Sequence, residues 1–229
     1  MINACKEVTA SPMVPDQPMG FTLLRVPFFL EPDYPTDPSF EETNRVRLIR
    51  KWGGKAGWEA QKRRHTLKER GQAVGIEKFN LDRVASNTLA SHRLVQWVTR
   101  TIGINEAEAL YNDLNFRHFE EGRKLNDEDL LVEAAVAVGA DETDARHAIR
   151  SGDGGKQIEA AQDVLRDLGV SGIPTLILGG KWQLPSGALS SGQLVDAFRS
   201  IEAQGGATGA LFAECLEIPS SVMEQTLAL

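Results

Sequence analysis

Hydrophobic and polar positions follow two different periods along this chain. Residues 21–30 form an apolar run rich in β-forming side chains, and a Pro-punctuated stretch over 31–38 follows it. Two shorter apolar runs, 175–178 and 181–184, flank the pair Gly179-Gly180. The first run predicts a strand that leads into an extended loop, and the two shorter runs predict a β-hairpin.

Between these strand-like regions the apolar residues recur at helical spacing. Ser39 and Glu42 have the spacing of a capping box, and Gly53-Gly54 is expected to end the helix that they open. Asn87 and Asn105 are predicted N-caps of later helices. Further helices are predicted over 58–74, 88–102, 106–119, from 126 onward, 141–150, 156–168 and 192–201.

Glycines and prolines divide the chain into segments. Residues 1–20 contain Pro12, Pro15 and Pro18, and we expect an irregular N-terminal segment there. Residues 38–155 are predicted to form a helical domain inserted between 21–37 and 156–203, which together form a second domain. Residues 204–229 are expected to be a loosely attached tail.

Charge and hydropathy narrow the possible functions. The 229 residues include 25 Lys and Arg against 32 Asp and Glu, which gives a net charge of −7. An acidic surface repels phosphate backbones, so we expect no nucleic-acid partner. No apolar run is long enough to span a membrane, and residues 1–20 lack the apolar core of a secretory signal. We therefore expect no membrane partner and a cytoplasmic location. Nothing in the sequence indicates the oligomeric state.

Cysteine is sparse. Cys5 and Cys215 are the two cysteines, and they form neither a CxxC pair nor a zinc-ligand pattern. Neither has an obvious helix N-terminus or basic partner to lower the pKa of its thiol. We expect both to be ordinary thiols in poorly anchored terminal segments, and we predict no metal site.

Four motifs resemble those of the DsbA-like thioredoxin family, in its FrnE-type branch, which is related to 2-hydroxychromene-2-carboxylate isomerases. The resemblance runs from about Leu23 to Ile201 and implies an α/β, thioredoxin-like fold with a large all-helical insertion. The motifs are Pro27-Phe28-Phe29-Leu30-Glu31-Pro32, Asn87-Thr88 with Ala90-Ser91-His92-Arg93-Leu94, Leu168-Gly169-Val170-Ser171-Gly172-Ile173-Pro174-Thr175 and Ser186-Gly187-Ala188.

The resemblance also implies candidate substrate-binding residues. In this family Pro174 would follow a cis peptide bond, and the exposed backbone of Ile173 would pair with an extended substrate. The insertion would place Asn87 and His92 over the same groove, where either could contact substrate. Asn87 has an alternative, purely structural role as an N-cap.

The family's first strand and its CxxC-bearing helix have no counterpart in this sequence, so the expected fold is incomplete at the N-terminus. Either the sequence is truncated there, or the segment has been lost. Ser11-Pro12 resembles the serine that replaces cysteine in related isomerases, but here prolines follow it instead of a long helix. The catalytic residues therefore stay unassigned.

Three functions remain open. The resemblance implies a thiol–disulfide oxidoreductase with protein thiols or disulfides as partners, and without CxxC we expect this sequence to be redox-inactive. The second is a glutathione-dependent isomerase or transferase, with glutathione as co-substrate. The third is a non-enzymatic peptide-binding module. We predict no bound cofactor.

Overall fold

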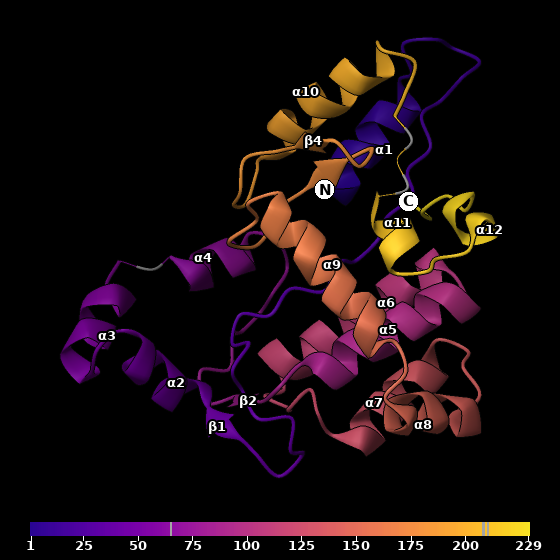
Figure 1. Ribbon diagram of the computed structural model, residues 1–229. Coiled ribbons are helices and arrows are strands. Elements are labelled where there is room, and N and C mark those ends of the chain that lie inside the picture. The colour runs from indigo at the N-terminus through magenta and orange to yellow at the C-terminus, as the bar shows by residue number, and fades with distance from the viewer. Residues whose placement is uncertain (65, 208, 210) are drawn as a thin grey trace. The chain divides into compact units, whose positions relative to one another are not determined.

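The computed structural model describes residues 1–64, 66–207, 209 and 211–229 (Figure 1). The chain divides into two compact units, which we describe separately. Unit 1 comprises Met1–Leu30, Gln96–Glu108 and Gly154–Leu229, and unit 2 comprises Glu31–Val95 and Ala109–Asp153. Two helices, α5 (Leu89–Thr101) and α6 (Ile104–Phe119), contribute residues to both units.

Unit 1 combines helices with one hairpin. Strands β3 (Ile177–Leu178) and β4 (Trp182–Gln183) pair antiparallel, with Ile177 opposite Gln183 and Leu178 opposite Trp182. Gly179 and Gly180 both have positive φ, which the tight turn requires, so the predicted hairpin is confirmed. The helices of this unit are α1 (Ile2–Ala10), α9 (Gly155–Asp167), α10 (Ser191–Glu202), α11 (Leu211–Cys215) and α12 (Ser220–Met223).

Two hydrophobic clusters form the core of unit 1. The α1–α10 cluster consists of Ala4, Cys5, Val8, Leu194 and Phe198, and the two helices lie side by side in Figure 1. The α9–α11 cluster consists of Ile104, Ala161, Leu165, Val170, Phe212, Ala213, Leu216, Ile218 and Val222. Ser190 caps α10 in a capping box with Gln193.

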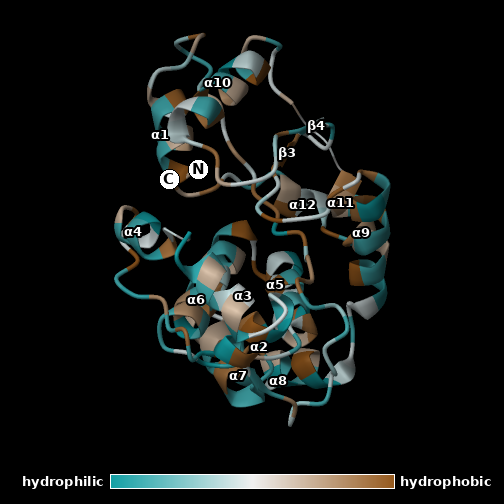
Figure 2. Cartoon of the chain, turned by 90° about the vertical axis from the view of Figure 1, so that its left-hand side faces the viewer, coloured by the Kyte–Doolittle hydropathy of each residue, from teal (hydrophilic) through white to brown (hydrophobic). Residues whose placement is uncertain are grey.

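Unit 2 is mainly helical. Its elements are β1 (Glu42–Thr43), α2 (Asn44–Lys51), α3 (Lys55–Lys62), α4 (Leu67–Gln72), β2 (Val84–Ala85), α7 (Glu128–Ala137) and α8 (Glu142–Ser151). Strands β1 and β2 pair antiparallel. Asp127 and Asp141 cap α7 and α8 through their side chains. Helix α7 carries both hydrophobic and hydrophilic residues (Figure 2), and its buried residues include Leu130, Leu131, Ala134 and Ala135.

Both ends of the chain are more ordered than the sequence predicts. Residues 2–10 are helical, and Ala4, Cys5 and Val8 are buried against α10. The prolines stand beyond this helix, so they end it and do not prevent it. In the predicted tail, Phe212, Leu216 and Val222 are buried in the α9–α11 cluster. The expectation of poorly anchored termini is therefore wrong, because tertiary packing stabilises helices whose local signals are weak.

The predicted strand over 21–30 does not form a paired strand. These residues belong to neither helix nor sheet. Three of their carbonyls accept hydrogen bonds from elsewhere in the chain: two from the side chains of Gln96 and Gln162, and one from the backbone N–H of Leu227. A strand needs a partner that supplies a ladder of hydrogen bonds, and within the described residues this segment has none.

Three predicted helix boundaries also change. Thr43, and not Ser39, caps α2, because the chain first forms β1. The predicted helix over 58–74 is divided between α3 and α4, and position 65 lies outside the described residues. Helix α6 begins before Asn105, whose amide side chain binds Thr226 O and Ala228 N instead of capping the helix.

Candidate functional site: the Ile173–Pro174 loop

The loop between α9 and β3 presents the backbone of Ile173 to solvent. Helix α9 ends at Asp167, Gly169 beyond it has positive φ, and the peptide bond between Ile173 and Pro174 is cis. Ile173 is 51% exposed. Within the described part of the chain, no hydrogen bond involves the backbone N–H or C=O of Ile173.

Three hydrogen bonds fix the shape of this loop. The Thr175 Oγ1 hydroxyl donates to Gly172 O at 2.8 Å, and the Ser186 hydroxyl lies 2.8 Å from Thr175 Oγ1, to which it can donate. Gly187 N donates to Pro174 O at 2.9 Å. The segment 186–187 therefore fixes the loop at two neighbouring residues: Gly187 binds the carbonyl of Pro174, and Ser186 binds the hydroxyl of Thr175. We did not predict this role, although Ser186-Gly187 is part of a motif in the family resemblance.

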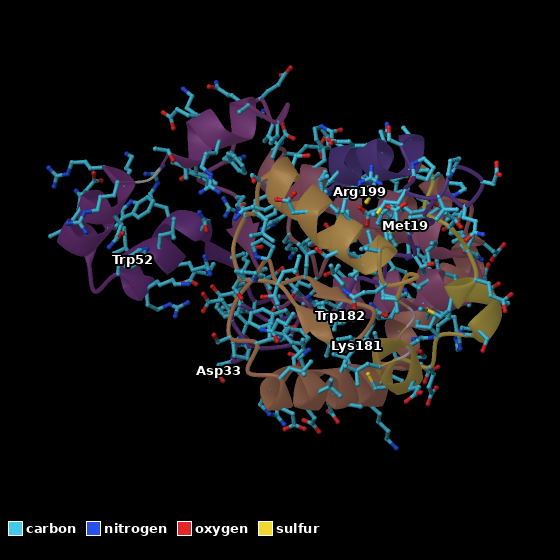
Figure 3. The ribbon with its side chains drawn as sticks, turned by 90° about the horizontal axis from the view of Figure 1, so that it is seen from above. Met19, Asp33, Trp52, Lys181, Trp182 and Arg199 are labelled. Carbon is cyan, nitrogen blue, oxygen red and sulfur yellow. The ribbon has the colours of Figure 1, made fainter. Side chains whose placement is uncertain are left out.

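The hairpin that follows the loop carries a paired cation and ring. Lys181 Nζ lies 4.2 Å from the centroid of the Trp182 ring, a cation–π contact on β4 and its turn (Figure 3). The loop and hairpin thus offer backbone hydrogen-bonding groups and apolar surface. They can bind an extended polypeptide, but they bring together no acid, base or nucleophile.

The two cysteines lie in different hydrophobic clusters of unit 1. Cys5 is 2% exposed within the α1–α10 cluster, and Cys215 packs against the α9–α11 cluster with its Sγ 3.5 Å from Phe212 O. Both are free thiols. Burial raises the pKa of both thiols, which lowers the fraction of reactive thiolate. This environment is the opposite of that of a redox-active cysteine.

Asn87 and His92 lie in unit 2, whereas Ile173 and Pro174 lie in unit 1. Asn87 is buried with both side-chain atoms engaged: Oδ1 accepts from Leu89 N at 2.8 Å, and Nδ2 donates to Tyr34 O at 2.6 Å. The side chain of Asn87 thus binds the first backbone N–H of α5, but the first backbone bond of the helix runs from His92 N to Thr88 O, so the helix begins one residue later than predicted. His92 lies in the first turn of α5 and is partly buried. A contact of either residue with substrate stays a prediction.

A second polar group in unit 2 surrounds Tyr34. Its hydroxyl donates to Glu42, and Arg50 bonds the same carboxylate at 3.0 Å. Burial and Glu42 raise the pKa of Tyr34 to about 12, so this phenol keeps its proton near neutral pH. These residues line an open hollow of ≈ 380 Å³ with Glu31, Asp33, Phe40 and Glu41. Arg50 pairs with Glu42 within the hollow, whereas Arg47 and Lys124, which do not line it, pair with Glu31 and Glu41. We assign no chemistry to it.

Two further properties bear on function. Among the residues described, no group of three or more His, Cys, Asp or Glu side chains is placed to hold a metal ion. A search of the helices in the same residues finds none that is long and apolar enough to cross a membrane.

The fold is that of thioredoxin-like proteins. A crystal structure of a probable DsbA oxidoreductase from Streptomyces coelicolor superposes with a TM-score of 0.70 at 23% sequence identity, over 90% of this chain and 83% of that chain. The family model of the DSBA-like thioredoxin domain matches residues 42–199. The chain therefore belongs to the DsbA-like thioredoxin family, and the predicted α/β fold with a helical insertion is confirmed. No curated protein matches the sequence.

Proposed function

We propose that residues 1–229 act as a polypeptide-binding protein of the DsbA-like family, in which the Ile173–Pro174 loop holds an extended peptide. The unpaired backbone of the exposed Ile173 carries this proposal. A backbone N–H and C=O that face solvent can add an extended partner by strand-like hydrogen bonding. The hydrogen bonds from Thr175, Ser186 and Gly187 support it, because they preorganise the loop before a peptide binds.

We further propose that the chain, as this sequence gives it, carries out no dithiol–disulfide exchange. Exchange requires an accessible thiolate and a second thiol to resolve the mixed disulfide. Cys5 is buried in one cluster, Cys215 is partly buried against the other, and both thiols have raised pKa values, which opposes this chemistry. We also propose that the chain belongs to the FrnE-type branch, which the resemblance of the four sequence motifs supports, and that it is located in the cytoplasm.

A peptide titration tests the binding site. We would titrate the 15N-labelled chain with a cysteine-free peptide of alternating Val and Thr flanked by Lys. The amide signal of Ile173 should shift in a saturable manner. Ile173→Glu should weaken binding at least tenfold, whereas Val136→Glu, at a side chain of similar exposure on α7, should not. Saturable binding that leaves the Ile173 signal unmoved would disprove the proposal.

An insulin-reduction assay tests the absence of redox activity. The chain with dithiothreitol should reduce insulin no faster than a variant that combines Cys5→Ser with Cys215→Ser. A clear excess rate that Cys5→Ser abolishes would show that the buried thiol is reactive after all.

A further inference from the structure

Segment 44–74 of unit 2 carries a charge opposite in sign to that of the chain as a whole. It contains ten Lys and Arg residues against two Asp and Glu residues, a net charge of +8 in a chain whose total is −7. The segment forms α2, α3 and α4, which are drawn in purple in Figure 1. The cations of α2 and those of α3 differ in whether they have partners.

The arginines of α2 are paired within unit 2. Each lies 2.7–3.0 Å from a carboxylate oxygen of this unit: Arg45 from Asp82, Arg47 from Glu31, and Arg50 from Glu42. These ion pairs neutralise α2 inside the chain, so its arginines offer little charge to a partner.

The cations of α3 have no such carboxylates. Lys55, Lys62 and Arg63 are exposed, and none of them forms an ion pair within the described residues. Glu59, the acidic residue of this helix, forms none in that part of the chain either. Unpaired charges of one sign repel each other. The fold therefore gains nothing from collecting these cations on α3.

Helical spacing places these charges on one face. Positions i, i+4, i+7 and i+8 lie on the same side of an α-helix. They are occupied by Lys55, Glu59, Lys62 and Arg63, which we call the α3 face. Lys55 and Lys62 are two turns apart, about 10 Å along the helix axis. The negative charge of Glu59 lies between them.

Packing against α2 fixes the orientation of the α3 face. Trp58 is buried, and a side chain at Gly57 would meet Trp52 O at 2.0 Å, so this other side of α3 lies against the end of α2. The α3 face is therefore presented to solvent before any partner binds. The methyl groups of Ala56 and Ala60 are exposed beside it and add apolar surface.

We propose that the α3 face binds an acidic segment of a partner protein. Charge complementarity selects an anion, because the three cations have no carboxylate of their own. Glu59 then discriminates among anions. A nucleic acid carries a negative charge at every nucleotide, so a phosphate would lie against Glu59, and like charges in contact weaken a complex. A polypeptide can place an uncharged residue there and its Asp or Glu residues opposite the cations.

Calorimetric titration of the whole chain tests the proposal. The probe is a capped decapeptide with Glu at its first, fourth, seventh and tenth positions and Ala elsewhere. It should bind in a saturable manner, and a rise in salt from about 0.05 to 0.5 M should weaken binding at least tenfold, because ions screen exposed charges. The same peptide with Gln in place of Glu should not bind. Equal binding of both peptides, or no binding of the acidic one, would overturn the proposal.

Two double variants locate the site. Lys55→Gln combined with Lys62→Gln should weaken binding at least tenfold. Lys6→Gln combined with Lys156→Gln removes the same charge from two exposed lysines of unit 1 and should leave the affinity unchanged. Equal losses in both double variants would mean that only the total charge matters, and would overturn the assignment to the α3 face.

The variant Ile173→Glu separates this site from the Ile173–Pro174 loop, which lies in unit 1. It should bind the acidic peptide as the unmodified chain does, even where it no longer binds the Val/Thr peptide. A loss of at least tenfold in affinity for the acidic peptide would show that this peptide occupies the loop, and would overturn the proposal.

An oligonucleotide decides between the two kinds of anionic polymer. A single-stranded oligo-dT of five nucleotides carries four negative charges, like the acidic peptide, and should bind at least tenfold more weakly. Glu59→Gln should reduce this difference by strengthening the binding of the oligonucleotide. An oligonucleotide that binds as tightly as the peptide, or a difference that Glu59→Gln leaves unchanged, would overturn the proposal.

Discussion

The two units differ in what they bury. Unit 1 encloses two apolar clusters, and its long-range polar contacts mostly join side chains to the backbone of chain segments such as 21–30 and 225–228. Unit 2 also has buried apolar residues on α7, but most of the buried polar residues in the described chain belong to it: Asn44, Ser86, Asn87, Ser91, Arg93 and Asn126. Apolar burial is non-directional, whereas buried polar groups destabilise a fold unless each finds its partner.

This difference predicts different responses to perturbation. Unit 1 should respond mainly to the loss of side-chain volume, and its stability should vary little with pH. Unit 2 should respond to the loss of single hydrogen bonds and to protonation. Substitutions at four residues, one in unit 1 and three in unit 2, test this contrast.

Leu216→Ala should have the largest effect. Leu216 is fully buried in the α9–α11 cluster, so the substitution removes apolar contacts and leaves a cavity. We expect the free energy of unfolding to fall by about 2–5 kcal/mol, measured by urea denaturation. Leu229→Ala, at a side chain that is 40% exposed, should change it by less than about 0.5 kcal/mol. Similar losses for both variants would contradict the assigned core.

His118 should make unit 2 sensitive to acid. The pKa of its imidazole is lowered to about 4, mainly by burial and also by the charges of Arg83 and Arg47, whereas the hydrogen bond between Nδ1 and Arg123 O opposes this shift. The unfolded chain takes up the proton near pH 6.5, so its contribution to stability is complete above that pH. The contribution should decrease as the pH falls from 6.5 to 4 and change no further below 4.

The His118 contribution is at most about 3 kcal/mol, and partial exposure of the side chain reduces it. His118→Asn keeps an N–H donor toward Arg123 O but does not titrate. The difference in unfolding free energy between the two proteins should therefore vary between pH 7 and pH 4. A constant difference across this range would show that the imidazole is not shielded from water in the folded chain.

Arg93 should have an intermediate effect. Its buried guanidinium donates to Asp153 O at 2.6 Å, Ala148 O at 2.8 Å and Ile149 O at 3.2 Å, and so satisfies carbonyls at the end of α8. Arg93→Lys keeps the charge but loses the forked donors, and we expect a loss of about 1–3 kcal/mol. Arg45→Lys, at an exposed ion pair with Asp82, should cost less than about 1 kcal/mol.

Local signals account for the features that the sequence predicted correctly. The hairpin at Gly179-Gly180 depends on residues that are neighbours along the chain. Such features need no knowledge of tertiary structure. The exposed Ile173 lies beside a recognisable motif, which is why this candidate site could be proposed from the sequence.

The features that were predicted wrongly depend on distant residues. Helix α1 is stabilised by α10, almost two hundred positions away, and the C-terminal residues are held by Asn105 and by the α9–α11 cluster. Segment 21–30 has the composition of a strand but lacks a paired neighbour, and composition does not reveal pairing. The Thr175–Ser186 hydrogen bond likewise joins two residues that no short motif connects.

Asn87 should have the smallest effect, and it decides between the two roles that the sequence left open. Asn87→Ala removes both the bond to Leu89 N and the bond to Tyr34 O, and the loss should be about 1 kcal/mol. Asn87→Asp keeps an acceptor for Leu89 N but loses the donor to Tyr34 O. It should therefore be the more stable of the two variants if the contact with Leu89 N dominates.

The affinity of both Asn87 variants for the Val/Thr peptide completes this test. A side chain whose two polar atoms are satisfied inside the protein has no free group for a ligand, so affinity should equal that of the unmodified chain under conditions where the variants remain folded. Because Asn87→Asp keeps the size of the side chain, a loss of affinity in both variants without a matching loss of stability would mean that Asn87 contacts the peptide. The buried polar groups of unit 2 would then serve binding as well as folding.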